Sequence, residues 1–328
     1  MQGSQLDVLN GCLQALNQGH QVTLVSVAKT WGTSPRPVGS LLAVTSHGQF
    51  YGSVSGGCIE EDLITRLSQQ PCEKPQLIMY GETAEQRHHF GLPCGGVLQL
   101  IIEPLNNIKE VQQLINSIEA RKAVYRRVEL NRLNTQLIPW QKDHIIELQG
   151  NTWGNIFGPT WRLLIIGAGE TGQFLAQMAQ GLGYEVLVSD PRPEYRKNWP
   201  LTQLPLLEGF PDDIITNMTI DERTAIVAVA HDPKVDDMAL LTALISNAFY
   251  VGALGSQQNN HDRRQRLKQH FGFSQTQVDR LHGPVGIYIG SKTPAEIALS
   301  ILAEITAIKN GVAVTKTVQS LSQYACQA

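Results

Sequence analysis

The chain contains little charge and no basic excess. Of its 328 residues, 17% are Asp, Glu, Lys or Arg, whereas soluble domains usually carry about 25%. The net charge is −3, so the positive charge that binding to a phosphate backbone requires is missing, and we expect no nucleic-acid partner. The low charge content also favours extensive contacts between protomers, and on this basis we expect a homodimer.

Long hydrophobic runs are missing too, although 42% of the residues are hydrophobic. No stretch approaches the roughly 20 apolar residues that a transmembrane helix needs. The first residues, Met1 to Asp7, include neither a basic stretch nor an apolar segment of signal-peptide length. We therefore expect a cytoplasmic protein without a membrane segment.

Cysteine is scarce and scattered. An odd number of cysteines without paired spacing does not predict a disulfide framework in a chain of this length. No Cys-x-x-Cys or Cys/His spacing indicates a zinc site either. A functional cysteine in this protein is therefore expected to act through the reactivity of its thiol rather than in a structural role. The five cysteines are Cys12, Cys58, Cys72, Cys94 and Cys326.

The length of the chain predicts two domains, because single hydrophobic cores usually stop growing at about 250–300 residues. A segment rich in Gly, Asn and Pro at 150–159 indicates the junction. We expect an N-terminal α+β domain over 1–155, a C-terminal domain over 156–312 and a tail over 313–328. Strands alternate with helices in the second half, so the C-terminal domain is predicted to be an α/β Rossmann domain with a doubly wound parallel sheet.

A glycine turn in the second half has the pattern of a dinucleotide site. Gly167, Gly169 and Gly172 follow an apolar strand and open a helix, and Asp190 ends the next strand about 20 residues later. These glycines would allow the turn, the approach of a pyrophosphate and close helix packing, while Asp190 would bind a ribose. The alternative is a Rossmann fold that keeps its packing glycines without binding a nucleotide. Arg192 leaves NAD versus NADP open.

Two further pairs of residues are expected at the same edge of the sheet. His231 and Asp232 end one predicted strand, and Gly255 and Ser256 follow the next. Open α/β sheets bind their ligands at the carboxyl ends of the strands, so all four are candidate ligand contacts. The structural alternative is that Asp232 only caps the helix that follows.

Two cysteines lie in glycine-rich turns. Cys58 follows Gly56 and Gly57 and opens a predicted helix, whose N-terminus would stabilise a thiolate that is reactive or acts as a soft metal ligand. Cys94 precedes Gly95 and Gly96 just before an apolar strand. Taken singly, a cysteine is more often a small buried hydrophobic residue, and that alternative stays open for both.

Two other patterns are interpreted without a functional role. Tyr288 and Lys292 have the Y-x-x-x-K spacing of short-chain dehydrogenases, but glycine and serine intervene before a helix cap at Thr293. We interpret the match as accidental, and no catalytic residue is predicted. The basic run 263–266 is interpreted as a solvated helix face rather than a phosphate site.

The combined motifs resemble the XdhC/CoxI family of xanthine dehydrogenase accessory proteins. The likeness extends over nearly the whole chain, and it includes the Ser-Gly-Gly-Cys segment joined to a Rossmann domain. It is carried by residues 30–39, 52–60, 91–96, 167–172, 190–192, 231–232, 250–256 and 283–304.

The resemblance implies a cofactor chaperone that is not itself the dehydrogenase. Such a protein binds the molybdopterin-type molybdenum cofactor transiently, supports its sulfuration by a cysteine desulfurase and delivers it to an apo xanthine dehydrogenase-type enzyme. We expect the cofactor at Gly56, Gly57, Cys58, Cys94, Gly95 and Gly96, with Cys58 and Cys94 as metal ligands. NAD(P) or another nucleotide would bind at Gly167, Gly169, Gly172, Asp190, His231, Asp232, Gly255 and Ser256.

Two other functions remain open. An NAD(P)-dependent oxidoreductase would turn over a small substrate with a nicotinamide, although the sequence offers no convincing acid or base for it. A nucleotide-sensing module, in which the Rossmann domain regulates a protein partner, is the second alternative.

Overall fold

The computed structural model describes residues 4–31, 36–90, 96–132 and 134–314. The chain divides into two compact units, 1–160 and 161–328. All but the first two residues of the expected tail, 313–328, lie outside the described residues. Within the described residues, no helix is both long and apolar enough to cross a membrane.

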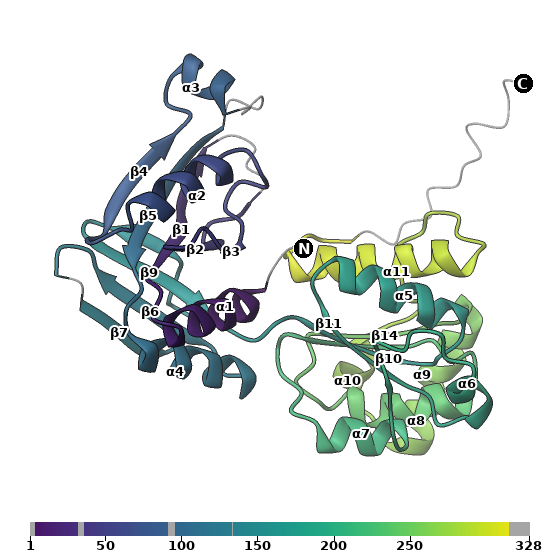
Figure 1. The fold of residues 1–328 in the computed structure, drawn as a ribbon. Coiled ribbons are helices and arrows are strands. Elements are labelled where there is room, and N and C mark those ends of the chain that lie inside the picture. The colour runs from purple at the N-terminus through teal and green to yellow at the C-terminus, as the bar shows by residue number, and fades with distance from the viewer. Residues whose placement is uncertain (1–3, 32–35, 91–95, 133, 315–328) are drawn as a thin grey trace, which may run out of the picture. The chain divides into compact units, whose positions relative to one another are not determined.

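The first unit is built on a five-stranded antiparallel sheet (Figure 1). Its central strand is buried along most of its length and pairs with a strand on each side. In spatial order the strands are β3 (Phe50–Gly52), β2 (Leu41–Thr45), β1 (Val22–Trp31), β5 (Val97–Pro104) and β4 (Gln76–Tyr80).

Helices cover both faces of this sheet. The helices α1 (Gln5–Asn17) and α4 (Ile108–Glu119) pack against each other and bury Leu9 and Leu114 with one face. On the other face, α2 (Glu60–Gln69) buries Leu63. The short helix α3 (Ala84–His89) follows β4. The loop that enters α2 is therefore attached to a helix that is packed on the sheet.

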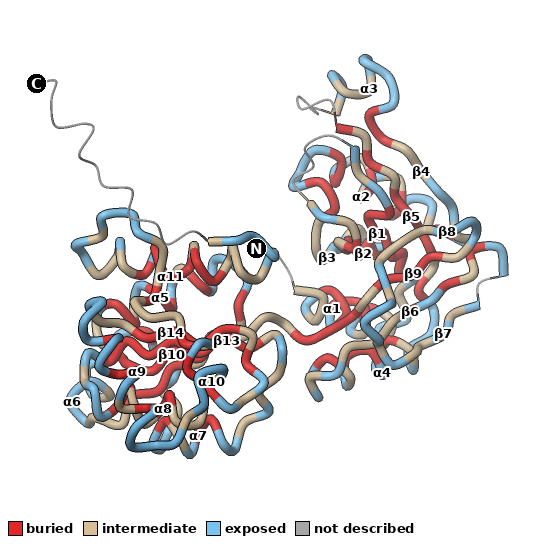
Figure 2. The backbone as a smooth tube through the Cα atoms, turned by 180° about the vertical axis from the view of Figure 1, so that it is seen from behind, coloured by how far each residue is buried: buried red, intermediate tan, exposed pale blue. Residues whose placement is uncertain are grey.

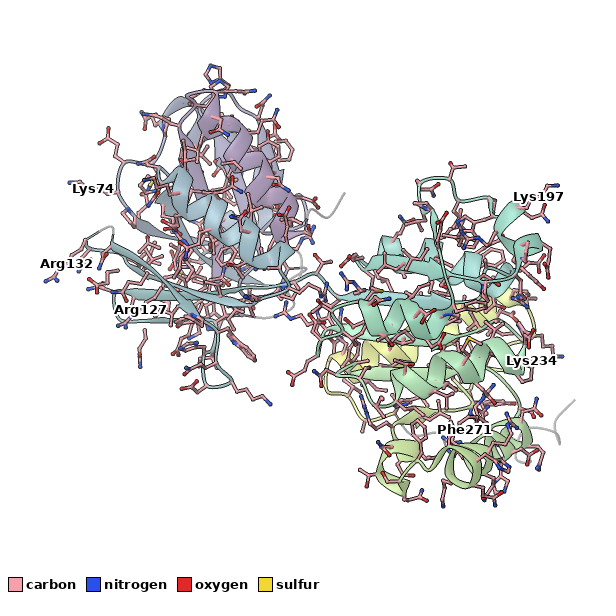
Figure 3. All side chains as sticks on the ribbon, turned by 90° about the horizontal axis from the view of Figure 1, so that it is seen from below. Lys74, Arg127, Arg132, Lys197, Lys234 and Phe271 are labelled. Carbon is pink, nitrogen blue, oxygen red and sulfur yellow. The ribbon has the colours of Figure 1, made fainter. Side chains whose placement is uncertain are left out.

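A second, four-stranded antiparallel sheet completes the first unit. Buried Trp153 packs with Ile101 and so joins the two sheets. Along β6, Arg126 is buried whereas Arg127 projects outward (Figure 3), as alternation in a strand requires. The spatial order is β7 (Asn134–Pro139), β6 (Val124–Glu129), β9 (Thr152–Phe157) and β8 (Glu147–Gln149).

The second unit contains a six-stranded sheet in which every strand pair is parallel. The order is that of a doubly wound Rossmann sheet, which confirms the predicted fold class. Figure 2 shows the buried backbone that runs through β10 and β13 at its centre. The strands are β12 (Leu206–Leu207), β11 (Glu185–Ser189), β10 (Arg162–Ile166), β13 (Thr224–Ala228), β14 (Tyr250–Ala253) and β15 (Leu281–His282).

Helices form a layer on each side of the parallel sheet (Figure 1). One layer buries Leu175 and Ile301, and the other buries Leu240 and Leu267. The first contains α5 (Glu170–Gly181) and α11 (Pro294–Lys309), and the second contains α7 (Pro211–Asn217), α8 (Pro233–Ala243), α9 (Gln257–Phe271) and α10 (Gln275–Asp279). The short α6 (Pro193–Lys197) follows β11.

Candidate functional site

The loop between β3 and α2, residues 53–58, is organised around one carboxylate. Glu60, the first residue of α2, is only 8% exposed. Its side chain accepts hydrogen bonds from the Ser53 hydroxyl at 2.7 Å, the Ser55 backbone N–H at 2.8 Å and the Gly57 backbone N–H at 2.9 Å. The Ser55 hydroxyl and the Val54 N–H also donate to it. Glu60 thus fastens the loop onto its own helix.

The environment of Glu60 keeps it ionised. Burial alone would raise the pKa of this carboxyl, but the hydrogen bonds from Ser55 and Ser53 outweigh that effect and lower its pKa to about 2. The hydroxyl of Ser55 in turn accepts the N–H of Ile59 at 3.1 Å. The amides on both sides of Cys58 are therefore already engaged by the protein.

Cys58 is exposed at the tip of this loop. The helix begins at Glu60 rather than at the predicted position 58, because Glu60 turns back to bind the loop and Ile59 becomes the cap. Gly56 and Gly57 have φ values of 82° and 119°, in the left-handed region that favours glycine. The amides that we expected to stabilise a thiolate instead donate to Glu60 and Ser55.

The second predicted cysteine turn is only partly covered by the structure. Cys94 and Gly95 lie outside the described residues, and Gly96 is buried just before β5. Of the other cysteines, Cys12 and Cys72 are buried, and burial raises the pKa of both thiols. The described cysteines form no disulfide. No cluster of three or more metal-ligating side chains occurs among the residues that the structure describes.

A pocket of about 270 Å³ adjoins the Cys58 loop. Arg36 and Ser53 contribute polar groups to it, and the Arg36 Nε donates to the Ser53 hydroxyl at 3.3 Å. Ser53 connects this pocket with Glu60. Arg36 and Glu60 belong to the sequence motifs, but neither was predicted to have a role. The available signal was an acid in the first helical turn directly after a Ser- and Gly-rich segment, a pattern typical of side-chain capping.

The three glycines of the turn in the second unit differ in how much space surrounds them. A side chain at Gly167 would lie 2.6 Å from the backbone of Ala230, and one at Gly172 would lie 2.0 Å from the carbonyl oxygen of Gly167. At Gly169 the nearest atom is 3.7 Å away, on Tyr195. The fold therefore requires the first and third glycines, whereas a Cβ at the second, at the N-terminus of α5, would make only an ordinary van der Waals contact with Tyr195.

Asp190, the predicted ribose acceptor, is fully buried and pairs with Arg192. Its Oδ2 lies 2.7 Å from Arg192 Nη2, and its Oδ1 lies 2.9 Å from Arg192 Nε. Oδ2 also accepts the N–H of Ala168, inside the glycine turn, at 2.8 Å. Burial would raise the pKa of Asp190, but these bonds prevail and lower it. The acid thus holds the turn and the arginine together.

The residues after β13 form a tight turn. His231 is exposed with a φ of 57°, and Asp232 caps α8 by accepting the N–H of Lys234 at 2.9 Å. Below the turn, the buried carboxyl of Asp236 accepts the N–H of Ala230 at 3.0 Å. Burial is the main cause that raises the pKa of Asp236 to about 6.

Arg263 in the basic run on α9 is buried, so the interpretation of the run as a solvated face is wrong for this residue, whereas the Arg266 side chain is 42% exposed. Arg263 is 4% exposed and pairs with Asp237 through Nε at 2.8 Å. Arg266 pairs with the same carboxylate at 2.6 Å, and Arg264 donates to the carbonyls of Leu281 and Gly283. All three arginines therefore pair with carboxylates or carbonyls of other elements, and Arg263 is buried by these contacts.

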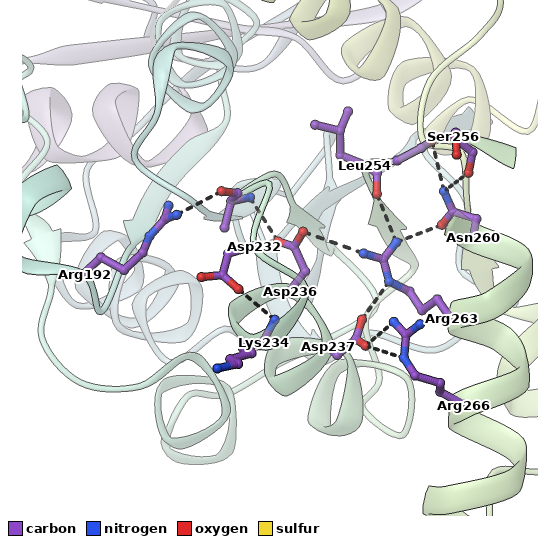
Figure 4. A network of polar contacts seen from close by, with 12 residues as sticks. Arg192, Asp232, Lys234, Asp236, Asp237, Leu254, Ser256, Asn260, Arg263 and Arg266 are labelled. Atoms are coloured by element: carbon purple, nitrogen blue, oxygen red, sulfur yellow. Dashed lines mark hydrogen bonds and ion pairs between the residues drawn. The ribbon is translucent and has the colours of Figure 1, made fainter. Parts of the chain in front are cut away.

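Arg263 also connects two of the predicted ligand contacts, Gly255 and Ser256, with the buried Asp236 (Figure 4). It lies 3.7 Å from Asp236 and donates to Asn260 at 2.9 Å. Asn260 donates to the carbonyls of Gly255 and Ser256, both at 3.1 Å. The hydroxyl of Ser256 caps α9. Because Arg192 donates to the Ala230 carbonyl and the Ala230 N–H donates to Asp236, a chain of polar contacts follows the carboxyl edge of the sheet from Arg192 to Ser256.

The Tyr288 to Lys292 segment does not form a dehydrogenase pair. Both residues precede α11, which begins at Pro294 after a capping box at Thr293. Tyr288 is 67% exposed. A catalytic Tyr/Lys pair would need both side chains on one helix face, and no helix contains them here.

Two protein-family models match this chain. The XdhC Rossmann domain matches residues 163–305, and the XdhC and CoxI family matches residues 15–81. The protein belongs to the XdhC/CoxI family. Together the two models cover more than half of the chain, and they place both the Cys58 loop and the glycine turn within family sequence.

Curated relatives of this XdhC/CoxI protein match it over nearly its whole length. The molybdenum cofactor insertion chaperone PaoD of Escherichia coli (strain K12) is 28% identical, over 92% of this chain and 88% of its own. A protein of Bacillus subtilis (strain 168), named as a probable xanthine dehydrogenase subunit, is 24% identical, over 91% of this chain and 96% of its own.

The fold of the XdhC/CoxI protein also has a solved counterpart. A crystal structure from Bacillus halodurans, described as a xanthine dehydrogenase, matches with a TM-score of 0.72 at 23% identity. The match covers 92% of this chain and 96% of the other. At this identity the likeness concerns the fold.

Proposed function

We propose that this protein binds the molybdopterin-type molybdenum cofactor as cargo and inserts it into a xanthine dehydrogenase-type apoenzyme. The full-length similarity to a molybdenum cofactor insertion chaperone is the observation that carries the proposal. In this proposal the protein acts in the cytoplasm as a homodimer. A cysteine desulfurase serves as its partner for replacing an oxo ligand of the cofactor by a sulfido ligand.

The exposed thiol of Cys58 supports this function chemically. Thiolate sulfur suits soft, sulfur-rich metal centres, and the loop presents Cys58 to solvent. The loop amides that could cradle a phosphate are already bonded to Glu60. The nearby cation of Arg36, beside the adjoining pocket, is therefore the group that we assign to an anionic part of the cargo. Cys94 remains a proposed second ligand.

We propose separately that the glycine turn of the Rossmann domain binds the phosphate of a nucleotide other than NAD(P). The N-terminus of α5 has no side-chain cap, and Gly169 leaves space beside it. Both features suit a phosphate group at the glycine turn. This proposal does not depend on where the molybdenum cofactor binds.

The test is anaerobic purification from cells that synthesise molybdenum cofactor, followed by molybdenum and pterin analysis. We expect both to accompany the wild-type protein and to be lost from Cys58→Ser and Cys94→Ser. Cys72→Ser is the matched control, because Cys72 is buried and bonded to the Lys74 carbonyl. Its cofactor content should equal that of the wild type.

Delivery is measured by activating an apo xanthine dehydrogenase-type enzyme with each protein. Normal binding and delivery by both cysteine variants would show that the thiols do not hold the cargo. Wild-type protein that contains neither molybdenum nor pterin would contradict the chaperone function itself. Turnover of a nicotinamide would then become the hypothesis to test.

A further inference from the structure

The acid that should bind a ribose in the Rossmann domain has no acceptor position left. A carboxylate offers about four lone-pair sites. On Asp190, Oδ1 accepts the Arg192 backbone N–H at 3.1 Å and Arg192 Nε at 2.9 Å. Oδ2 accepts Arg192 Nη2 at 2.7 Å and the Ala168 N–H at 2.8 Å. Three of the four donors belong to one residue.

Arg192 is also fixed from other directions. Its Nη1 donates to the carbonyl of Ala230 at 3.1 Å, so it reaches from the end of β11 to the turn after β13 (Figure 4). Its guanidinium lies 3.8 Å from the centre of the Tyr195 ring. Tyr195 is also the residue nearest to the open side of Gly169. The arginine thus crosses the place where strand order reverses, which is where such sheets bind ligands.

We propose that Arg192 is a specificity-determining residue that closes the ribose position of this Rossmann domain. An NAD(H) ribose would have to replace the Nε and Nη2 bonds, which are charge-assisted and bidentate, with bonds from neutral hydroxyls. The 2′-phosphate of NADP(H) would have to draw Arg192 away while facing the charge of Asp190. We therefore expect neither dinucleotide to bind tightly while Arg192 remains paired with Asp190. This inference rests on the geometry of the second unit and does not depend on the cargo proposal.

Removal of the arginine side chain should open the position. In Arg192→Ala, buried Asp190 loses two donors, and ribose hydroxyls can supply them. We expect the variant to bind NAD⁺ at least about tenfold more tightly than the wild type in calorimetric titration of the full-length protein. Adding Asp190→Asn to this variant should abolish the gain.

The matched control is Arg196→Ala on the same short helix. Arg196 donates to the backbone carbonyls of Asp190 and Leu207 and leaves the Asp190 carboxylate untouched. Its loss should leave NAD⁺ affinity at the wild-type level. Circular dichroism checks that each variant is folded. Should Arg192→Ala not fold, Arg192→Lys keeps the charge without the bidentate fork and should still gain affinity.

Two results would overturn the proposal. One is equal affinity for NAD⁺ in the wild type and in the folded Arg192 variant, whether both bind tightly or both bind weakly. The other is an equal gain in Arg196→Ala, which would mean that loosening this helix, rather than freeing the carboxylate, admits the dinucleotide. A gain confined to Arg192 variants and dependent on Asp190 supports it.

Discussion

The Glu60 Oε2 atom lies 2.9 Å from the backbone nitrogen of Gly57 and closes the loop that carries Cys58. The carboxylate thereby takes the position that a bound anion would have in an open loop of amides. Phosphate binding by this loop would require Glu60 to withdraw. The loop therefore supports the Cys58 thiol. We expect a ligand to contact the outer surface of the loop, where this thiol lies.

Glu60→Gln should destabilise the first unit. The Gln amide nitrogen would face N–H donors in place of a carboxylate oxygen, so we expect the free energy of unfolding at pH 7 to fall by about 2 kcal/mol. Urea denaturation measures this. Glu61→Gln is the control, since Glu61 is exposed on the same turn. Equal stability of both variants would contradict the bracing role of Glu60.

The Glu60 carboxylate also predicts that the protein loses stability at low pH. The pKa of Glu60 falls from 4.5 to about 2 on folding because the serine and amide donors outweigh its burial. Its contribution to stability is therefore fully present above pH 4.5 and is lost as the pH drops through about 2. The free energies of unfolding of the wild type and Glu60→Gln should converge as the pH falls through this window. A difference that stays constant would contradict the prediction.

Asp236 predicts the opposite pH dependence. Burial raises its pKa from 3.8 to about 6, so the folded state favours the protonated form. Stability from this group is present below pH 3.8 and is lost as pH rises through about 6. Asp236→Asn stays neutral and can still accept the Ala230 N–H. Relative to the wild type it should gain about 2 kcal/mol between pH 4.5 and 7.5 in denaturation experiments. A pH-independent difference would refute this.

Two glycines of the same turn should respond differently to alanine. Gly172→Ala would bring a methyl group to 2.0 Å from the Gly167 carbonyl oxygen, and we expect a loss of about 3 kcal/mol. Gly169→Ala meets nothing nearer than 3.7 Å and should change stability by less than about 1 kcal/mol. Thermal unfolding of the two variants tests the distinction, and similar losses would contradict it.

A buried ion pair connects the two sheets of the first unit. Arg126 donates to Glu103 at 2.7 and 3.0 Å and pairs with Glu110 at 2.6 Å. Arg126→Met leaves these carboxylates without their cation, which should cost about 3–5 kcal/mol. Arg127→Met, at the exposed neighbouring position, should be nearly neutral in the same urea titration. Comparable losses in both would point to strand propensity instead.

The sequence predicted those features that local pattern controls. The apolar strand over 162–166, the glycine turn and the capped helix after Thr293 are all found, because strand burial, turn geometry and capping act over a few residues. The parallel, doubly wound sheet of the second unit follows from the alternation of strands and helices.

Contacts between distant segments could not be read from local pattern. Arg263 resembles a surface residue in a basic run, yet Asp237 of another helix draws it inside. Asp190 matches a ribose acceptor by spacing, yet its neighbour Arg192 occupies its oxygens. Sequence spacing predicts the position of a residue on its strand or helix. The partner that its side chain contacts depends on the tertiary fold.

The closed loop at Cys58 also affects the entropy of binding. Gly56 and Gly57 are the kind of residues that lose the most conformational freedom when they become ordered. Because Glu60 and Ser53 already hold their amides, that freedom is lost when the chain folds. A ligand that reaches the thiol meets an ordered partner, so its affinity is not reduced by having to immobilise the loop.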